Sequence, residues 1–491
     1  MGSNDNNVLH AIGEVTYGVP PQPRKQAFTG FSVTSGVISF LGVSNATDFK
    51  AGQSIAVADC GFALANGYYV VKANGTGTTV TADLPAGKAT ITTPNSDSGT
   101  LGNHIKLRFD SEDLGLTPGR GESPEVTGST GVANLREDTR SAAGTTAFQF
   151  LLPAIGERIR RAAFADWTYA GSAGELDGDP TSIQVVVSGT TVIKKGTAWG
   201  SGVNAGDWVR IYSSDASYVN RGRACRVVSK DTENGGTSGE LVVDYCNLTA
   251  HAGNTTLRIV KADMLENGST KFPETIERIY TDEDVATAGA PRFPGSLINT
   301  FQVGGDAGST LTGQIAYMIA DEIATPITFL AKELDPSLVS DLAQRADLPS
   351  SDDVTAGFSE IWIDGSDGGC AKRSSWQINN NLDPNYCWGS EALKGIDKRR
   401  LNVTGDFTRR YASKTRHDVF LSNGSESLVY KHGTAKKHAT GPLYIVQFKA
   451  VQYTAANRGT QGANTSSESS YSWTAINQGS GWTYRVFRWE A

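Results

Sequence analysis

Long apolar runs, methionine and cysteine are scarce in this chain, and each scarcity excludes a class of protein. Of the 491 residues, 3 are methionine and 5 are cysteine, and charged residues make up 19%. No stretch approaches the roughly 18 consecutive apolar residues of a membrane-spanning helix. The segment from Met1 to Asn7 has neither the basic start nor the apolar core of a secretory signal. We therefore expect a protein made in a cytosol, with no membrane insertion by this chain.

The cysteines are also unsuited to a metal site. Their count is odd, and their spacing matches no zinc-binding pattern. We interpret them as free thiols in a reducing cytosol. Two disulfides stay open as alternatives, between Cys225 and Cys246 on neighbouring strands and between Cys370 and Cys387. The full set is Cys60, Cys225, Cys246, Cys370 and Cys387.

Motifs for nucleotide, metal and catalytic sites are missing. The only Gly-Lys pair, Gly87-Lys88, is followed by Ala89, where a phosphate-binding loop needs Ser or Thr. The six histidines show no metal-ligand spacing, and we interpret His432 and His438 as parts of a solvated basic loop. No Gly-x-Ser-x-Gly nucleophile motif occurs. These absences argue against an enzyme that works through such sites.

Acidic residues do cluster, as in Asp352-Asp353 and at Asp364 and Asp367, which leaves a two-carboxylate glycosidase site as an alternative. The segment from Asp364 to Gly369 lacks the acidic ladder and closing Glu of a calcium loop, and we predict an ordinary turn there. We expect no catalytic site, cofactor or metal. The formal net charge of −7 also argues against high-affinity nucleic-acid binding by the outer surface, because such binding needs basic side chains that neutralise phosphates.

Glycine, in contrast, is abundant, and Thr, Ser, Asn and Val recur in short runs bounded by turn residues, which predicts a mainly β protein. One β-rich module occurs twice, over 31–108 and 184–260, with Gly52 and Gly206 in matching places. The last strand of the first copy is expected at 105–109. A repeat found first marks the remainder as a separate, split domain. That domain consists of 1–30, 109–183 and 261–491.

Helical periodicity occurs clearly once in the split domain, over 153–166. Ile155 and Ile159 share one face there, and Pro153 suits the first turn. We expect residues 8–30 to form an extended arm and the Gly/Pro/Glu-rich segment 115–131 to form a loop that a partner orders. Strands are expected at 276–280, 298–303, 310–320, 360–364, 374–379, 400–410 and 442–453, with a turn at 288–295 and a polar tail at 457–472.

Short motifs run through the split domain in a fixed order. They are Glu14-Val-Thr-Tyr-Gly-Val-Pro, Asn134-Leu-Arg-Glu-Asp-Thr-Arg140, a helix ending at Trp167, Thr275-Ile-Glu-Arg-Ile-Tyr, Phe293-Pro-Gly-Ser-Leu-Ile, Ile378-Asn-Asn-Asn-Leu, Val403-Thr-Gly-Asp-Phe and Leu443-Tyr-Ile-Val. In this order they resemble the tail tube proteins of long-tailed bacteriophages. The resemblance covers most of the chain outside the repeated modules.

The resemblance implies a tail-tube β-sandwich with one flanking α-helix, interrupted by two related β-barrel-like or β-sandwich modules on the outer surface. It implies a structural virion protein that forms hexameric rings stacked into a helical tube, made and assembled in the cytoplasm of the bacterial host. The lumen would hold the tape-measure protein and then genomic DNA without sequence-specific binding, and an acidic lumen would let DNA slide. Tail-terminator and baseplate or tip proteins would bind the tube ends.

Some tail tubes instead fuse two tube domains in one chain and form trimeric rings. We disfavour this alternative because neither copy of the repeated module contains the helix or the Asn-Asn-Asn-Leu strand. If the second module only decorates the outer surface of the tube, deleting 184–260 should leave assembly intact. A second alternative is a carbohydrate-binding lectin or adhesin, in which Tyr68, Tyr69, Trp199 and Trp208 stack on sugar rings.

Contacts between subunits are expected from particular segments. Strands 301–320, 400–420 and 443–453 would build a closed inner barrel, which removes every sheet edge. The arm and the segment 115–131 would reach the adjacent ring. The candidate interface residues are Glu14, Tyr17, Arg120, Glu122, Arg136, Arg140, Phe301, Tyr317, Phe407, Tyr444, Phe448, Trp482 and Trp489.

Overall fold

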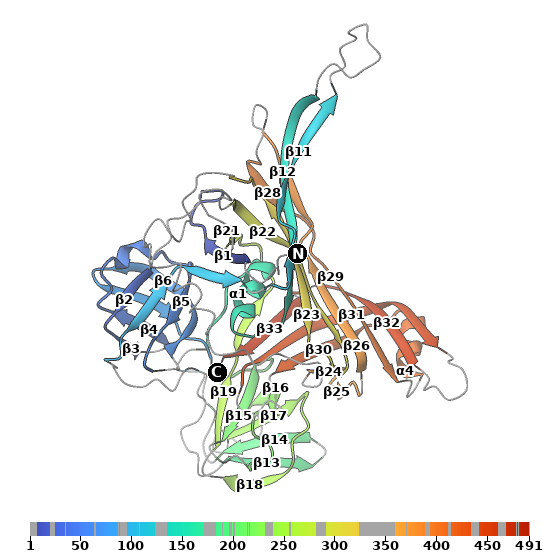
Figure 1. Cartoon of the computed structure of the whole chain (residues 1–491). Helices are drawn as coiled ribbons and strands as arrows, with labels where there is room; N and C mark the ends of the chain where they lie inside the picture. Colours follow the sequence, from blue (N-terminus) through green and yellow to red (C-terminus); the bar gives the residue numbers. More distant parts are fainter. Residues whose placement is uncertain are drawn as a thin grey trace.

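A computed structural model shows a β-strand body that carries two lateral β-modules and one projecting hairpin (Figure 1). The prediction of a mainly β chain is confirmed. The structure describes residues 7–19, 25–34, 36–62, 65–86, 88, 96–107, 109–122, 135–150, 152–170, 183–188, 190–195, 199, 202–213, 215, 217–230, 239–254, 257–280, 291–323, 359–369, 371–387, 393–410, 414–433, 441–459, 468–477, 479 and 481–490.

The two copies of the repeated module form separate antiparallel sheets with a shared strand order. The first sheet runs β2-β8-β5-β6-β7-β4-β3. Taken in the matching direction, the second runs β19-β15-β16-β17-β14-β13-β18. Without β2 and β18, the two orders match strand for strand, from β8 with β19 to β3 with β13. Gly52 and Gly206 both adopt positive φ angles, +81° and +94°. Their N–H groups donate to Val71 and Val227, each at 2.8 Å. The strands are β2 (Lys25–Phe28), β3 (Gly30–Thr34), β4 (Val37–Leu41), β5 (Ser54–Ala58), β6 (Gly67–Thr76), β7 (Thr79–Asp83), β8 (Gly99–Gly102), β13 (Ile183–Ser188), β14 (Thr190–Lys195), β15 (Trp208–Ser213), β16 (Ala224–Lys230), β17 (Gly239–Asp244), β18 (His251–Asn254) and β19 (Leu257–Lys261).

The remaining long strands form one barrel-like body with two layers. The long sheet has the order β11-β12-β23-β22-β26-β29-β32-β31. The back sheet has the order β25-β24-β30-β31-β33-β20. Their strands are β11 (Gly115–Glu122), β12 (Leu135–Gln149), β20 (Asp263–Glu266), β22 (Arg292–Asp306), β23 (Thr312–Ile319), β24 (Ser359–Ile363), β25 (Ser366–Asp367), β26 (Ala371–Asn379), β29 (Asn402–Arg410), β30 (Glu426–Gly433), β31 (Leu443–Gly459), β32 (Glu468–Ala475) and β33 (Tyr484–Trp489).

Two strands, β22 and β31, change partners along their length. The first part of β31 lies between β30 and β33, and its last part pairs with β32. The first part of β22 pairs with β21 (Glu274–Tyr280), which pairs with β1 (Asn7–Gly13), and β1 pairs with β9 (His104–Leu107). The short strand β10 (Ser111–Glu112) pairs with β12, and β27 (Leu382–Asn385) and β28 (Gly395–Lys398) form a separate two-stranded sheet.

Aromatic side chains fill the space between the two layers. Trp376 of the long sheet lies 5.6 Å from Phe301 and 6.5 Å from Phe448 of the back sheet, measured between ring centroids. Phe448 also lies 4.8 Å from Trp473. All four are almost fully buried. Burial of large apolar surface is the main favourable contribution to folding, so this cluster is what holds the layers together.

Helix α1 (Leu152–Ala163) closes one end of this core, as the periodicity predicts, and brings buried charges with it. Arg158 donates twice to the Glu274 carboxylate, at 2.6 and 3.0 Å, and Arg161 donates to Glu157 at 2.7 Å. Burial raises the pKa of Glu157, but the neighbouring arginines outweigh it and hold that pKa at about 2. Arg160 reaches the carbonyl of Gly52 at 3.2 Å, which attaches the first module to the helix.

The second module packs on the back sheet. Trp208 of that module donates to Gln447 at 3.2 Å, and Lys431 donates to the carbonyl of Tyr245 at 2.6 Å. Trp208 and Tyr245 share one buried cluster with Trp362 and other apolar side chains of the back sheet. Deleting 184–260 would expose this cluster to water, so loss of assembly after that deletion would not distinguish decoration from a structural role.

Several sequence-based expectations differ from the structure. The strand at 105–109 is β9, which pairs with β1 and therefore belongs to the body rather than to the first module. Residues 115–122 of the expected loop form β11, whose register with β12 shifts between Pro118 and Arg120. Residues 415–421 form helix α4 (Thr415–Leu421), where a strand through Phe420 was expected. Residues 292–295 begin β22 rather than ending a turn, and β31 and β32 extend into the expected polar tail.

Three further expectations concern the turn after Ile363, the arm and the cysteines. The two-residue turn at Asp364-Gly365 has positive φ angles of +51° and +76°, which suits an Asp-Gly hairpin turn. The described parts of the arm pair within their own subunit: residues 7–13 form β1 of the body, and residues 25–28 form β2, which pairs with β8 and therefore belongs to the first module. The described cysteines, Cys60, Cys225, Cys246 and Cys387, are free thiols, and Cys370 lies outside the described residues.

The close approach of Trp473 to β29 yields a stability prediction. A Cβ added at Gly405 would lie 2.4 Å from a ring carbon of Trp473 and 2.5 Å from the Ser375 carbonyl oxygen. We expect Gly405→Ala to lower the free energy of unfolding by about 1–3 kcal/mol, the usual cost of overpacking, in denaturant titrations. Gly395→Ala, whose Cβ would meet nothing within 4 Å, is the matched control. Equal effects of the two substitutions would contradict the prediction.

Candidate functional surfaces

The outward face of the long sheet carries rows of small, uncharged polar side chains. One row crosses seven strands through directly paired positions, and a second row does the same with one acid. The first row is Ala147, Gln314, Gln302, Gln377, Thr404, Thr474 and Gln452. The second row is Gln149, Thr312, Gly304, Ser375, Asp406, Ser472 and Ala455.

We call this surface the neutral face. Strand alternation produces it, because Phe301, Val303 and Trp376 point into the core while Gln302 and Gln377 point away. Across the two rows there is no Lys or Arg, and the single acid, Asp406, accepts a hydrogen bond from Ser375 at 2.5 Å. Every side chain of the two rows is half-buried or exposed. The face is therefore open, hydrated and nearly free of charge in a chain whose net charge is −7.

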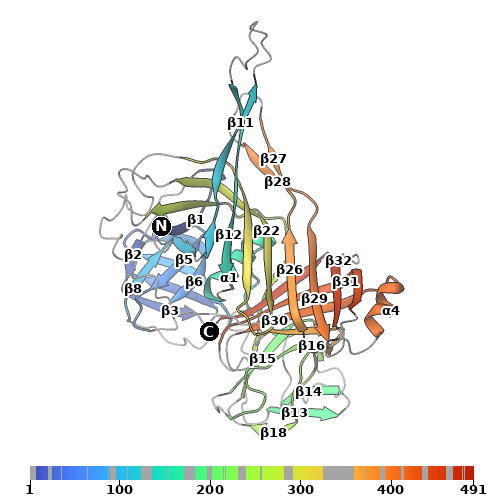
Figure 2. The same cartoon turned by 45° about the vertical axis from the view of Figure 1, so that its right-hand side comes forward.

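A second surface is the hairpin of β11 and β12, which projects far beyond the body (Figures 1 and 2). Beyond Thr117 and Ser141 its strands pair only with each other in the described part of the chain. A hairpin of this kind offers backbone and side-chain groups to another molecule.

The long sheet also ends in two strand edges. Within the described residues, β11 pairs only with β12, and residues 455–459 of β31 pair only with β32. Unpaired edges of this length attract further strands, and folded proteins protect or use them. These two edges lie at opposite ends of one continuous sheet.

The interface candidates from the sequence fall into separate places, and their part in subunit contacts stays a prediction. The backbones of Arg120, Glu122, Arg136 and Arg140 lie in the projecting hairpin. Glu14 is buried in its own subunit, where it accepts hydrogen bonds from Thr275 at 2.6 Å and Gly295 at 2.8 Å, and Tyr17 packs beside Gly295. Trp482 is half-buried under Arg485. The others are buried in the core of the subunit: Phe301, Tyr317, Phe407, Tyr444, Phe448 and Trp489.

A comparison with protein families gives a match over residues 5–475 to the model described as phage tail tube protein. The chain belongs to the phage tail tube protein family. It is thereby a structural component of a virion tail. A comparison with curated proteins gave no match. Among solved structures, the phage phi92 endosialidase is 10% identical over 97% of this chain and 69% of that chain, with a TM-score of 0.14, which carries no argument.

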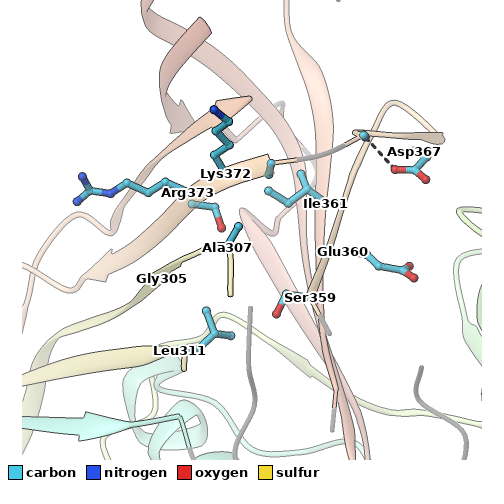
Figure 3. A pocket seen from close by; sticks show the side chains of 12 residues that line it. Gly305, Ala307, Leu311, Ser359, Glu360, Ile361, Asp367, Lys372 and Arg373 are labelled. Atoms are coloured by element: carbon cyan, nitrogen blue, oxygen red, sulfur yellow. Dashed lines mark hydrogen bonds between the residues drawn. The ribbon is translucent and has the colours of Figure 1, made fainter. Parts of the chain in front are cut away.

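The tail tube protein has a pocket of about 400 Å³ between the ends of β22 and β26 and the β24–β25 hairpin (Figure 3). Its polar groups are engaged within the chain. Asp367 accepts from the N–H of Gly369 at 2.8 Å, Glu360 accepts from Trp362 at 3.0 Å, and Lys372 pairs with Glu468. Ser359 also lines the pocket, and its hydroxyl lies 3.0 Å from the Nδ1 atom of His432.

His432 corrects the expectation of a solvated basic loop, because it is buried in β30. Trp376 donates to its Nε2 atom at 3.3 Å, so the neutral ring carries its proton on Nδ1, which lies 3.0 Å from Ser359. That ring donates to the hydroxyl and takes no proton from it. The Ser359–His432 pair is therefore structural, and residues 434–440, including His438, lie outside the described residues.

Three of the four aromatic residues behind the lectin alternative are buried and not available for stacking on sugars. Tyr69, Trp199 and Trp208 are buried at 2%, 3% and 0% exposure, and Tyr68 packs against the main core. In the described part of the chain, no group of three or more His, Cys, Asp or Glu could hold a metal ion. None of the helices described is long and apolar enough to cross a membrane.

A buried carboxyl joins the first module to the body. Asp263 of β20 is fully buried and accepts from the N–H groups of Ala86 and Ala170, each at 2.9 Å, and from Arg488 at 3.3 Å. Burial raises the pKa of Asp263 to about 6, although Arg488 opposes the rise. Lys88 lies in the same region, and burial lowers its pKa to about 8, so it stays charged wherever Asp263 titrates.

This raised pKa predicts a pH-dependent contribution to stability. Between about pH 4 and pH 6 the folded chain keeps a proton on Asp263 that the unfolded chain has lost. The stabilisation from this bound proton is complete below about pH 4 and is lost as pH rises through 6. We expect the native protein to lose on the order of 2–3 kcal/mol of unfolding free energy, relative to Asp263→Asn, when the pH rises from 4 to 7. A difference that does not change with pH would contradict the assignment.

Proposed function

We propose that the protein self-assembles into rings that stack into a hollow tail tube and that the genome passes through this tube. The observation that carries the proposal is the combination of family membership with one continuous sheet that ends in two unpaired edges. A ring built by pairing those edges would remove them, as closure does in other β-barrels. The channel would hold the tape-measure protein and then DNA. The tube ends would bind tail-terminator and baseplate or tip proteins.

The location of the two modules indicates which face of the long sheet would point into the channel. The second module packs on the back sheet, and the first is attached through α1 and β20. None of these contacts involves a residue of the two rows of the neutral face. The neutral face would therefore line the channel, with the modules on the outside. Assembly from subunits made in the bacterial cytoplasm fits the free thiols of the described cysteines.

A nearly uncharged lining replaces the expected acidic lumen in this proposal. DNA binds proteins mainly where Lys and Arg neutralise its phosphates and release counterions. The rows from Ala147 to Gln452 and from Gln149 to Ala455 offer no such side chain. Amide and hydroxyl groups hold water instead, so the polyanion would pass without being held.

Charge on this face gives a direct prediction. We expect assembled tubes of the native protein and of Gln302→Glu to retain no fluorescent DNA duplex short enough to enter them, while Gln302→Lys tubes retain it. For two neutralised phosphates, that retention should fall roughly tenfold between about 50 and 200 mM salt. Thr190→Lys, at an exposed residue of the second module, is the control with equal charge. Salt-sensitive retention by native tubes would show that the channel lining is not neutral.

The projecting hairpin gives a prediction about stacking. Replacing residues 118–140 by Asn-Gly would close the hairpin as a tight turn between the paired residues Thr117 and Ser141. We expect a folded subunit that forms rings but not stacked tubes in negative-stain electron microscopy, because the hairpin would reach the next ring.

The native protein, imaged under the same conditions, should form rings or tubes with a central channel. An unchanged midpoint of thermal unfolding would show that the shortened protein is intact. Tubes of native length from the shortened protein would contradict the stacking role, and monomers alone from the native protein would contradict the proposed function itself.

A further inference from the structure

The body of the protein contains one structural unit twice. The first unit comprises, in chain order, β1, β9, β11, β12, α1, β21, β22 and β23, and the second comprises β24, β25, β26, β29, α4, β30, β31 and β32. Each strand pairing in the first unit has its counterpart in the second. The counterparts are β1–β9 and β24–β25, β1–β21 and β24–β30, β11–β12 and β26–β29, β12–β23 and β29–β32, β21–β22 and β30–β31, and β22–β23 and β31–β32.

The equivalence extends to irregularities in the strands. A register shift separates Glu274 from Ile276 where β21 pairs with β22, and the same shift separates Glu426 from Leu428 where β30 pairs with β31. A second shift, at Thr300 in β22, recurs at Ala455 in β31. Bulges fix register, so two bulges at matching places are strong evidence of one repeated design.

Side chains at these places match as well. The glutamates at the first bulge, Glu274 and Glu426, are both buried, and each faces an arginine of its helix. Glu274 is 2.6 Å from Arg158 of α1, and Glu426 is 4.0 Å from Arg416 of α4. In the neighbouring strands, Gly144 and Gly405 occupy equivalent positions opposite Tyr317 and Trp473, and both lack room for a Cβ.

The two β-modules lie at loops that are short in the second unit. The first module lies between β1 and β9, where the second unit has the Asp364-Gly365 turn. The second module lies between α1 and β21, where the second unit needs only the few residues from Ser422 to Ser425. The modules are thus insertions into one of two otherwise equivalent units.

The pairing of β22 with β26 joins the two units inside the chain. Along the long sheet, the first unit contributes β11-β12-β23-β22 and the second contributes β26-β29-β32-β31, so the two outermost strands are β11 and β31. In the described part of the chain, each of these two strands of the long sheet has one edge that pairs with no other strand, although the N–H of Leu116 in β11 donates to the Glu322 carboxylate at 2.8 Å. The junction inside one chain therefore gives a template for the junction between chains.

We propose that β31 of one chain pairs with β11 of the next in the register of β22 with β26, and that a ring of six units therefore contains three chains. The template pairs Thr300 with Asn379 and Gln302 with Gln377. Its counterpart pairs Ala455 with Thr117 and Asn457 with Gly115 of the next chain. This inference rests on the proposed ring and replaces the expected hexamer of chains by a trimer with six units.

Disulfide crosslinking tests both the register and the number of chains. The double variant Ala455→Cys with Thr117→Cys, in a background with Cys370→Ser and Cys387→Ser, places two cysteines directly opposite each other across the junction. Opposite residues on antiparallel strands lie about 4.5–5.5 Å apart, within disulfide reach. After assembly and mild oxidation, we expect a denaturing gel to show bands of one, two and three chains and no larger species.

The control moves one cysteine along the strand. Ala455→Cys with Gly115→Cys shifts one partner by two residues, or about 7 Å, and should give at least tenfold less crosslinking. A ladder that continues to six chains would overturn the trimer. Equal crosslinking of the shifted pair, or none of either pair in assembled tubes, would overturn the register. Failure of the unoxidised native protein to form rings would instead contradict the proposed function.

Discussion

The hydrogen-bonding needs of two long strands, β22 and β31, determine the form of this protein. Each is too long for a single partner, so each pairs with one strand in its first part and another in its last part. A bulge in each strand marks the change and increases the local twist. The two layers, the aromatic core between them and the two unpaired edges of the long sheet all follow from this arrangement.

The same arrangement separates the surfaces that we assign to different tasks. The core side of the long sheet carries Phe301 and Trp376, while the other side carries Gln302 and Gln377, because successive residues of a strand alternate. The back sheet is covered by the second module, and buried charges around α1 and Asp263 attach the first. Among the described residues, the neutral face, the hairpin and the edges are the surfaces that we assign to assembly of the tail tube.

Sequence patterns could predict the parts of this fold that depend on local periodicity. The helix at 153–166 and strands such as 374–379 follow from the spacing of apolar residues, and the repeated modules keep a glycine turn at Gly52 and Gly206. The segment at 115–122 was missed because glycine and proline conceal a strand that β12 stabilises. The neutral face and the repeated unit depend on which strands pair, and the two units keep few identical residues, such as Glu274 and Glu426. An alternation of apolar with uncharged polar residues, as in Phe301-Gln302 and Trp376-Gln377, was the one available signal.

Cryo-electron microscopy of assembled tubes would test the central claim most directly. The account predicts rings of three chains in which six equivalent units surround the channel, with β31 paired to β11 of the neighbouring chain. Gln302 and Gln377 would face the channel, and both modules would lie on the outer surface. A ring of six chains, modules inside the channel, or a neutral face buried between subunits would contradict it.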